Sequence, residues 1–144
     1  NKIADKYEAS IISKKVEGVD LAILKIDSEQ NFPVLKSNFQ AIARGESVRL
    51  TGFPDYTIGH QPLFYPAEIS GYRKNNHGVN CMILSQSINK GQSGSPIIYS
   101  GKVVGIGCFG PRDPHPDIAS KNWQNAAVPI PLIKSIPLIK EKEE

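Results

Sequence analysis

Apolar residues in this chain occur in short runs that alternate with polar residues and end at glycine, proline or asparagine. Such alternation over about four to eight residues is typical of strands with one buried face, and turn residues separate neighbouring strands. The pattern predicts strands at residues 7–14, 19–26, 47–53, 63–70, 79–85, 96–99, 103–107 and 125–130. A helix is expected at residues 131–142, although Pro137 would shorten or kink it. Short strands in this number predict an all-β barrel or sandwich.

Composition adds bounds on size and on partners. The chain has 144 residues, of which 40% are hydrophobic, and this is enough for one core. We expect residues 1–140 to form one domain and residues 141–144 to form a charged tail or linker. The net charge of +3 comes from scattered basic residues, so no nucleic-acid partner is expected. No apolar stretch reaches the roughly 18 residues of a membrane span, so no membrane partner is expected either.

The most distinctive local pattern is Gly-Gln-Ser-Gly-Ser-Pro at residues 91–96, directly before an apolar run. Glycines on both sides of Ser93 allow a sharp turn that comes close to a substrate carbonyl. Ser93 would then present its hydroxyl outward as a nucleophile, and the N–H groups of Gly91 and Ser93 could bind the oxyanion of a tetrahedral intermediate. The alternative is a serine whose hydroxyl caps a glycine-rich hairpin.

This segment resembles the nucleophile region of chymotrypsin-fold (trypsin-like) serine proteases, and residues 87–94 are most similar to HtrA (Deg-like) proteases and glutamyl endopeptidases. Residues 19–26 resemble the strand of these proteases that carries the triad aspartate, with Asp20 in the aspartate position. The resemblance spans residues 7–139. It implies a chymotrypsin-like double β-barrel with the second barrel complete, the first barrel partial, and a C-terminal helix.

The resemblance implies a serine endopeptidase that works by acyl transfer. Ser93 would attack the peptide carbonyl, Asp20 would orient a histidine, and the Gly91 and Ser93 amides would form the oxyanion hole. In this fold the histidine precedes the aspartate along the chain. All the histidines here follow Asp20, at His60, His77 and His115. Loss of the histidine costs about 10⁶ in turnover, so we expect the histidine from an N-terminal part of the same domain, outside this chain, and little activity from the chain alone.

Asp20 also has an alternative interpretation. The apolar run at residues 19–24 predicts a strand that is buried on both faces, where a carboxylate needs a hydrogen-bond donor. In the resembling proteases that donor is the histidine ring. The other interpretation is a solvent-facing aspartate that bonds a neighbouring turn.

The resemblance further implies the walls of the pocket for the residue before the scissile bond. Cys108, Phe109 and Gly110 would form one wall, and Ser87 and Ile88 the opposite one. None of these residues is charged, so the pocket should favour a small or medium apolar side chain.

The remaining features limit which cofactors and partners are expected. Cys81 and Cys108 are expected to be free, buried thiols, and the absence of Cys-x₂-Cys or His-x₃-His spacing leaves no metal site or cofactor expected. Polar loops at residues 71–78 and 110–122 are candidate rims of a substrate groove or ordinary connections. The expected partner is a polypeptide substrate, and the HtrA resemblance leaves a homo-oligomer open. The rival function is a catalytically inactive protease fold that binds peptides or serves as a scaffold.

Overall fold

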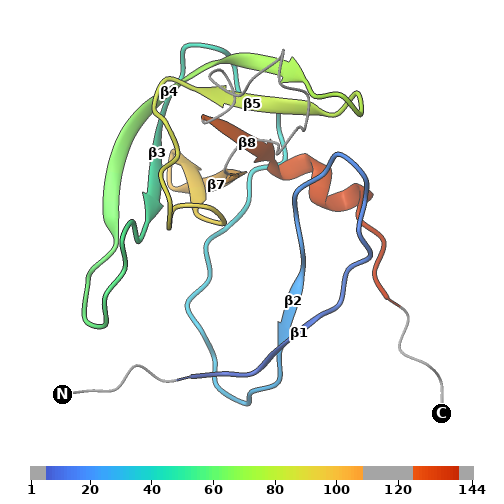
Figure 1. Ribbon diagram of the computed structural model, residues 1–144, viewed down its shortest axis with the longest axis vertical. Coiled ribbons are helices and arrows are strands. Elements are labelled where there is room, and N and C mark those ends of the chain that lie inside the picture. The colour runs from blue at the N-terminus through green and yellow to red at the C-terminus, as the bar shows by residue number, and fades with distance from the viewer. Residues whose placement is uncertain (1–5, 109–124, 140–144) are drawn as a thin grey trace.

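Six strands close into a barrel in the computed structural model, which describes residues 6–108 and 125–139 (Figure 1). The strand order around the barrel is β3-β4-β5-β8-β7-β6, and neighbouring strands are antiparallel. The closed order leaves each barrel strand paired on both sides, which removes the exposed edges of an open sheet. The barrel strands are β3 (Ser47–Gly52), β4 (Leu63–Lys74), β5 (Asn80–Leu84), β6 (Pro96–Tyr99), β7 (Lys102–Gly107) and β8 (Ala126–Pro129).

The period-two alternation of the sequence decides which side chains fill the barrel. In β3, Val48 and Leu50 are buried while Ser47 and Arg49 are exposed. The inward side chains of the other strands pack with Leu50 into one cluster, which contains Ile69, Met82, Leu84, Ile97, Val104 and Ala127. The predictions of an all-β barrel and of these strands are therefore confirmed.

Strand β4 is longer than its sequence pattern predicts. A loop was expected at residues 71–78, but β4 continues to Lys74, which pairs with Asn80 of β5. The register shifts between Ile69 and Gly71, where a bulge bends the strand without ending it. Gly71 looks like a strand terminator in the sequence, yet a glycine in a strand often marks such a bulge.

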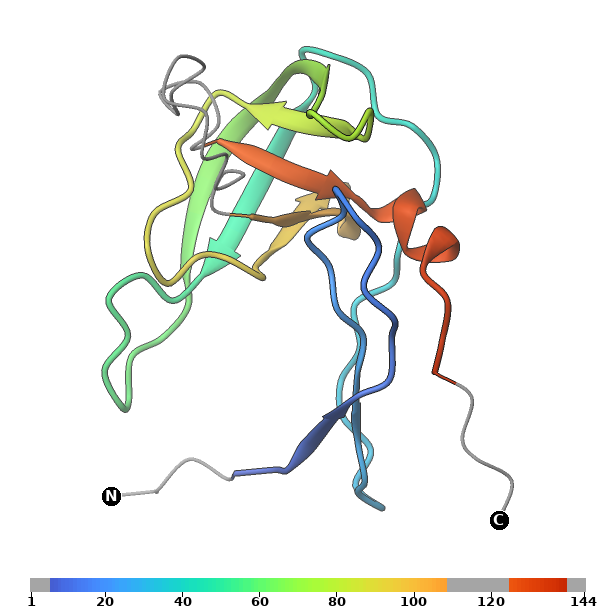
Figure 2. The same cartoon turned by 45° about the vertical axis from the view of Figure 1, so that its right-hand side comes forward.

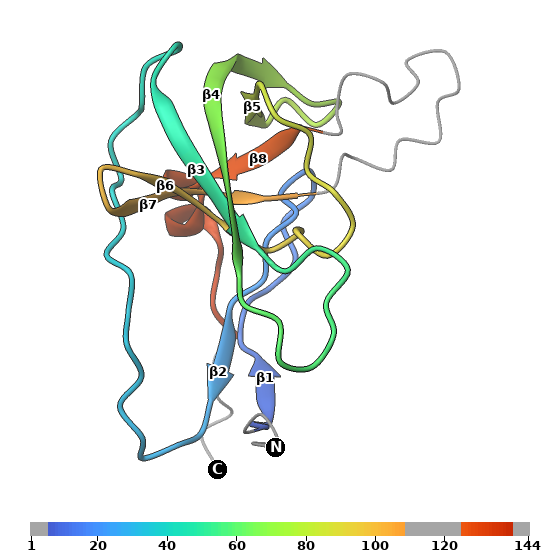
Figure 3. The ribbon, with the colours of Figure 1, turned by 90° about the vertical axis from the view of Figure 1, so that its left-hand side faces the viewer.

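Two further strands, β1 (Ala9–Ile11) and β2 (Leu24–Ile26), form a separate antiparallel sheet. We call residues 7–26 the N-terminal hairpin; Figures 2 and 3 show it as an arm that extends from the barrel. The sequence predicted longer strands at 7–14 and 19–26, and their extent was wrong. All residues of β1 and β2 are exposed, and no described strand pairs with their outer edges. Without a partner strand at either outer edge, the backbone lacks the inter-strand hydrogen bonds that would lengthen β1 and β2.

Besides a hydrogen bond from Asn75 to Gly18 O at its tip, the N-terminal hairpin is held by two sets of contacts. The first is a backbone contact with the end of the chain, where Lys14 N–H donates to Pro137 O (2.8 Å) and Ile139 N–H donates to Ile12 O (2.8 Å). The second is an apolar cluster on the outside of the barrel that includes Val19. Its other buried members are Ile83, Cys108, Ala126, Val128 and Ile136. These contacts fix the segment that carries Asp20 against β5, β8 and Cys108, the residue that follows β7.

The C-terminal helix is present but shorter than predicted. It is the 3₁₀ helix η2 (Ile130–Ser135), and Ile136 after it is extended. The expected end at residue 142 was wrong, because Pro137 lacks an N–H and disfavours a helical conformation at the residue before it. Residues 140–144, including the predicted tail, lie outside the described residues. In the part of the chain that the structure describes, no helix is long and apolar enough to cross a membrane.

Candidate active site

Ser93 lies on the connection between β5 and β6, in a turn that is fastened to the barrel. Gly94 N–H donates to Gly107 O (2.8 Å), and Gly107 N–H donates to Ser95 O (2.8 Å), so the turn pairs with the end of β7. Within the turn, Gln92 N–H donates to Asn89 O (2.9 Å). The Ser93 residue itself is exposed, as the outward hydroxyl of the sequence prediction requires.

The glycines beside Ser93 have backbone conformations that other residues rarely adopt. Gly91 has φ +88° and Gly94 has φ +82°, which lie in the left-handed region. A Cβ at Gly91 would also lie 2.6 Å from the carbonyl oxygen of Phe53. Among the described residues, the N–H groups of Gly91 and Ser93 have no hydrogen-bond partner. Neither donor is therefore committed to a hydrogen bond within the described protein.

Gln92 supports the turn from within the protein. Its side chain is 1% exposed, and its Oε1 accepts a hydrogen bond from Asn89 N–H (2.7 Å). Its Nε2 has no partner among the described residues. The Oε1 bond ties the residue before Ser93 back to the start of the turn, which restricts how far the turn can move.

Asp20 lies at the centre of a second tight turn, in the N-terminal hairpin. Leu21 N–H donates to Val19 O (3.0 Å) across it. The prediction that this segment is buried on both faces was wrong, because Val19 is buried while Asp20 and Ala22 are exposed. Only one face of the hairpin packs against the barrel, so every second side chain remains uncovered.

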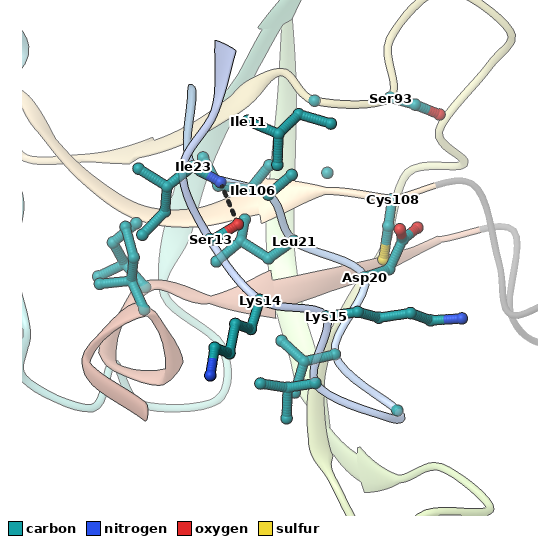
Figure 4. Close-up of a pocket in the computed structure, with 18 of the residues that line it drawn as sticks. Ile11, Ser13, Lys14, Lys15, Asp20, Leu21, Ile23, Ser93, Ile106 and Cys108 are labelled. Carbon is teal, nitrogen blue, oxygen red and sulfur yellow. Dashed lines mark hydrogen bonds between the residues drawn. The ribbon is translucent and has the colours of Figure 1, made fainter. Parts of the chain in front are cut away.

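The structure brings Asp20 and Ser93 to the same cavity, which has a volume of about 1130 Å³ and lies between the N-terminal hairpin and the barrel. Figure 4 shows the Asp20 carboxylate beside the Cys108 thiol, with Ser93 on the neighbouring turn. No hydrogen bond joins Asp20 to Ser93 in the described residues. The two side chains therefore share a cavity without contacting each other through a hydrogen bond.

Cys108 forms part of the floor of this cavity. Both cysteines are free and buried, as the sequence predicted. The Cys108 thiol donates to Ala126 O (3.3 Å). Burial raises the pKa of Cys108 to about 12, and the neighbouring Cys81 and the negative charge of Asp20 add to the rise. Cys108 is therefore a neutral thiol at neutral pH, which suits a position beside a carboxylate.

The raised pKa of Cys108 predicts slow alkylation. An unfolded chain ionises this thiol near pH 9, whereas the folded protein does so near pH 12. We expect iodoacetamide at about pH 9 to modify Cys108 at least tenfold more slowly in the folded than in the unfolded protein, because the thiolate is the nucleophile. The same difference in pKa makes stability depend on pH. The contribution of the neutral thiol to the free energy of unfolding is full below pH 9 and is lost as the pH rises towards 12, because the unfolded chain ionises first. Mass spectrometry of the Cys108 peptide measures the rate, and equal rates in the two states would contradict the prediction.

The predicted walls of the substrate pocket lie in different environments. Ser87 is exposed, but Ile88 is 1% exposed and belongs to the barrel core. Ile88 can therefore contribute to a pocket wall only through its backbone. Phe109 and Gly110, like the predicted loop at residues 110–122, lie outside the described residues.

The two histidines that the structure describes do not connect Asp20 with Ser93. His77 lines the same cavity, but it packs on the tip of the N-terminal hairpin, where a Cβ at Gly18 would lie 2.5 Å from its Cβ. The His60 Nδ1 accepts a hydrogen bond from Thr57 N–H (3.3 Å) in a separate loop. Neither ring hydrogen-bonds to Asp20 or Ser93. His115 lies outside the described residues.

Sequence reasoning missed the polar residues that hold the N-terminal hairpin in place. Ser13 is buried, and its Oγ accepts a hydrogen bond from Ile23 N–H (2.9 Å) across the hairpin (Figure 4). Asn75 donates to Gly18 O (2.7 Å) from the turn between β4 and β5. Asparagine between two strands signals a turn, but no sequence spacing reveals that the turn contacts a hairpin 57 residues away.

Comparison with known proteins agrees with this architecture. Residues 3–106 match the family profile described as a trypsin-like peptidase domain. None of the curated proteins matches the chain. Among solved structures, an inactive form of Rv3671c from M. tuberculosis has a TM-score of 0.67 at 19% identity, over 90% of this chain and 62% of that one.

Two further solved structures are similar to the chain. Deg5 has a TM-score of 0.63 at 23% identity, over 90% of this chain and 58% of its own. The HtrA-type protease AlgW, solved with a tripeptide, has a TM-score of 0.65 at 23% identity, over 88% of this chain and 41% of its own. The chain thus spans less than two thirds of each of these structures, and at these identities the likeness establishes the fold.

Proposed function

The chain belongs to the trypsin-like peptidase family, and from that premise we propose that its full-length protein is a serine endopeptidase with Ser93 as nucleophile and Asp20 as triad aspartate. One observation carries the proposal: Ser93 and Asp20 come from different parts of the fold yet line one cavity. In a catalytic triad of this family, a histidine bonds to both the aspartate and the serine, and a shared cavity is where such a ring would have to lie. Membership of the family makes this chemistry more expected, but a fold alone does not establish a function. The placement of Ser93 and Asp20 at one cavity is a separate argument for it.

The proposed reaction divides peptide hydrolysis into two steps. Ser93 Oγ bonds to the carbonyl carbon while its proton passes to the histidine, and the N–H groups of Gly91 and Ser93 bind the oxyanion. The C–N bond then breaks, and the leaving amine takes the proton from the histidine. A water molecule then attacks the acyl ester in the same way, and the breakdown of this second intermediate releases the acid product and regenerates Ser93. Asp20 holds the ring in orientation and stabilises the imidazolium.

We assign the histidine to protein outside these 144 residues. The chain matches 62% and 58% of two of its structural neighbours, and apolar side chains of the N-terminal hairpin are uncovered. Ile11 is 62% exposed, Leu24 57% and Ile26 44%. Apolar strands with free edges are suited to further strand pairing and burial. A segment of the same protease domain that pairs with β1 or β2 would cover them and could deliver the histidine to the cavity.

The proposed substrate is a polypeptide with an apolar residue before the scissile bond. The residues that the family resemblance assigns to the pocket walls within the described chain are the neutral Cys108, Ser87 and Ile88, and none of them is charged, so these walls offer a buried charged side chain no partner. Assembly of the full-length protein into a homo-oligomer stays a proposal that rests on the likeness to HtrA-type proteases.

A catalytically inactive module that binds peptides is the second candidate function. The observation in its favour is that neither described histidine bonds to Asp20 or Ser93. Such a module would keep the cavity and the two free N–H groups, which can bind a peptide carbonyl without cleaving it.

Labelling with an irreversible serine-reactive phosphonate separates the two functions. The reagent needs an activated serine, so we expect it to label Ser93 in the full-length protein and not in the Ser93→Ala variant. Tryptic peptides and mass spectrometry identify the modified residue. A folded full-length protein that takes up no label would exclude the protease and favour the peptide-binding module.

A further inference from the structure

One side chain of the turn between β4 and β5, Asn75, donates a hydrogen bond to the tip of the N-terminal hairpin. Asn75 Oδ1 accepts hydrogen bonds from His77 N–H (3.0 Å) and Val79 N–H (3.0 Å), and these bonds shape its own turn. Asn75 Nδ2 donates to Gly18 O (2.7 Å), which belongs to the hairpin. The two ends of one amide therefore have different tasks: the oxygen builds the turn, and the nitrogen binds the hairpin to it.

The tip of the hairpin fits closely against this turn. Gly18 has φ +78°, and a Cβ at this position would lie 2.5 Å from the Cβ of His77. Val79 packs against the apolar cluster that contains Val19. Since the backbone approaches so closely, a shift of the β4–β5 turn cannot leave Gly18 in place.

The hydrogen bond from Asn75 ends two residues before Asp20, and the intervening backbone is tightly turned. Val19 N–H donates to Val16 O (3.1 Å), and Leu21 N–H donates to Val19 O (3.0 Å). Val19 is also anchored by burial in the apolar cluster. With both sides of Asp20 held in short turns, a displacement of Gly18 is passed on to the carboxylate.

We propose that Asn75 is a positioning residue, which holds the Asp20 carboxylate at the cavity by binding Gly18 O. This role rests on the proposed function, because Asp20 must meet a histidine there. A carboxylate displaced by about 1 Å would orient that histidine poorly, and misplacement of this size can cost up to about 10² in rate. Asn75 also lines the cavity, but its Nδ2 bonds to Gly18 O and not to Ser93 or Asp20, so it acts on Asp20 through Gly18.

The Asn75→Asp variant tests this role with a single atom change. Aspartate keeps an oxygen that accepts from His77 and Val79 N–H, but it loses the donor to Gly18 O and places a negative oxygen near that carbonyl. In the full-length protein we expect kcat to fall about 10- to 100-fold with KM nearly unchanged. We also expect the acidic limb of the kcat/KM profile to move to lower pH, because a displaced carboxylate stabilises the imidazolium less.

Asn38→Asp is the matched control. Asn38 Oδ1 accepts from Gln40 N–H (3.0 Å) within its own loop, and aspartate preserves this bond. The control makes the same chemical change in another loop, so its kcat, KM and pH profile should match those of the wild type. A loss in Asn38→Asp as large as in Asn75→Asp would show an effect of added charge alone and would overturn the proposal.

Amide hydrogen exchange gives a readout that does not depend on activity. Exchange at the Val19 and Leu21 amides should accelerate at least tenfold in Asn75→Asp and not in Asn38→Asp, because the hairpin tip opens more easily. Unchanged exchange would overturn the link between Asn75 and the tip. Faster exchange with unchanged kcat and pH profile would overturn the positioning role. If the wild-type full-length protein neither cleaves peptides nor takes up the phosphonate, the proposed function fails and the positioning role with it, whereas the exchange result still decides the link.

Discussion

Replacing Ser93 with alanine should lower the turnover of the full-length protein by about 10⁶-fold. The nucleophile and its base act as a unit, so removing the hydroxyl leaves only the contribution of the oxyanion hole and of substrate binding. Ser93 is exposed, and the shape of its turn is set by the neighbouring glycines. We therefore expect Ser93→Ala to fold normally, so that a misfolded protein would not account for the loss. Cleavage of a fluorogenic peptide with an apolar residue before the scissile bond measures the effect.

Ser70→Ala is the matched control for this experiment. Ser70 is exposed on β4, away from the cavity that Ser93 lines, so its loss should leave kcat and KM unchanged. Equal melting temperatures for the two variants would show that the loss in Ser93→Ala is chemical. A Ser93→Ala protein with more than about 1% of wild-type turnover would exclude Ser93 as the nucleophile, because that residue would account for too little of the rate.

Replacing Asp20 with asparagine should lower kcat by about 10⁴-fold. The amide is nearly isosteric with the carboxylate, but it cannot stabilise an imidazolium and allows the wrong tautomer of the histidine. Because Asp20 is exposed and lies beside the neutral Cys108 thiol, the substitution should change stability little. Steady-state kinetics of the full-length protein measure the loss, and the phosphonate should label Ser93 correspondingly more slowly.

Asp27→Asn controls for the loss of a negative charge in the same part of the chain. Asp27 forms an exposed ion pair with Lys25 at 3.7 Å, and surface pairs of this kind contribute little. We expect Asp27→Asn to retain wild-type kinetics. An Asp20→Asn variant as active as Asp27→Asn would remove Asp20 from the proposed triad and leave it as a solvent-facing residue of the hairpin.

The barrel could be predicted because its pattern is local. In β3, the alternation of Ser47, Val48, Arg49 and Leu50 indicates which side chains point inward before any partner strand is known. The helix shows the limit of the same reasoning. The apolar spacing favoured a helix to residue 142, but a single proline ended η2 at Ser135.

The N-terminal hairpin was predicted less well because its burial depends on what covers it. An apolar run such as residues 19–24 suggests two buried faces, yet only the face that contacts the barrel is covered, and Asp20 is exposed. Ile88 shows the opposite case. The family resemblance implied a pocket wall at this position, but the barrel closes around its side chain.

The sequence by itself determined the all-β architecture and the glycine turn around Ser93, because alternation and the need for left-handed glycines are properties of neighbouring residues. Only the tertiary structure decided that Asp20 shares a cavity with Ser93 and that Asn75 binds the backbone before Asp20. Those relations join residues that are far apart in the chain, and they arise from strand pairing and from the packing of the hairpin on the barrel. A pattern among neighbouring residues does not indicate which distant segments of the chain will pack together.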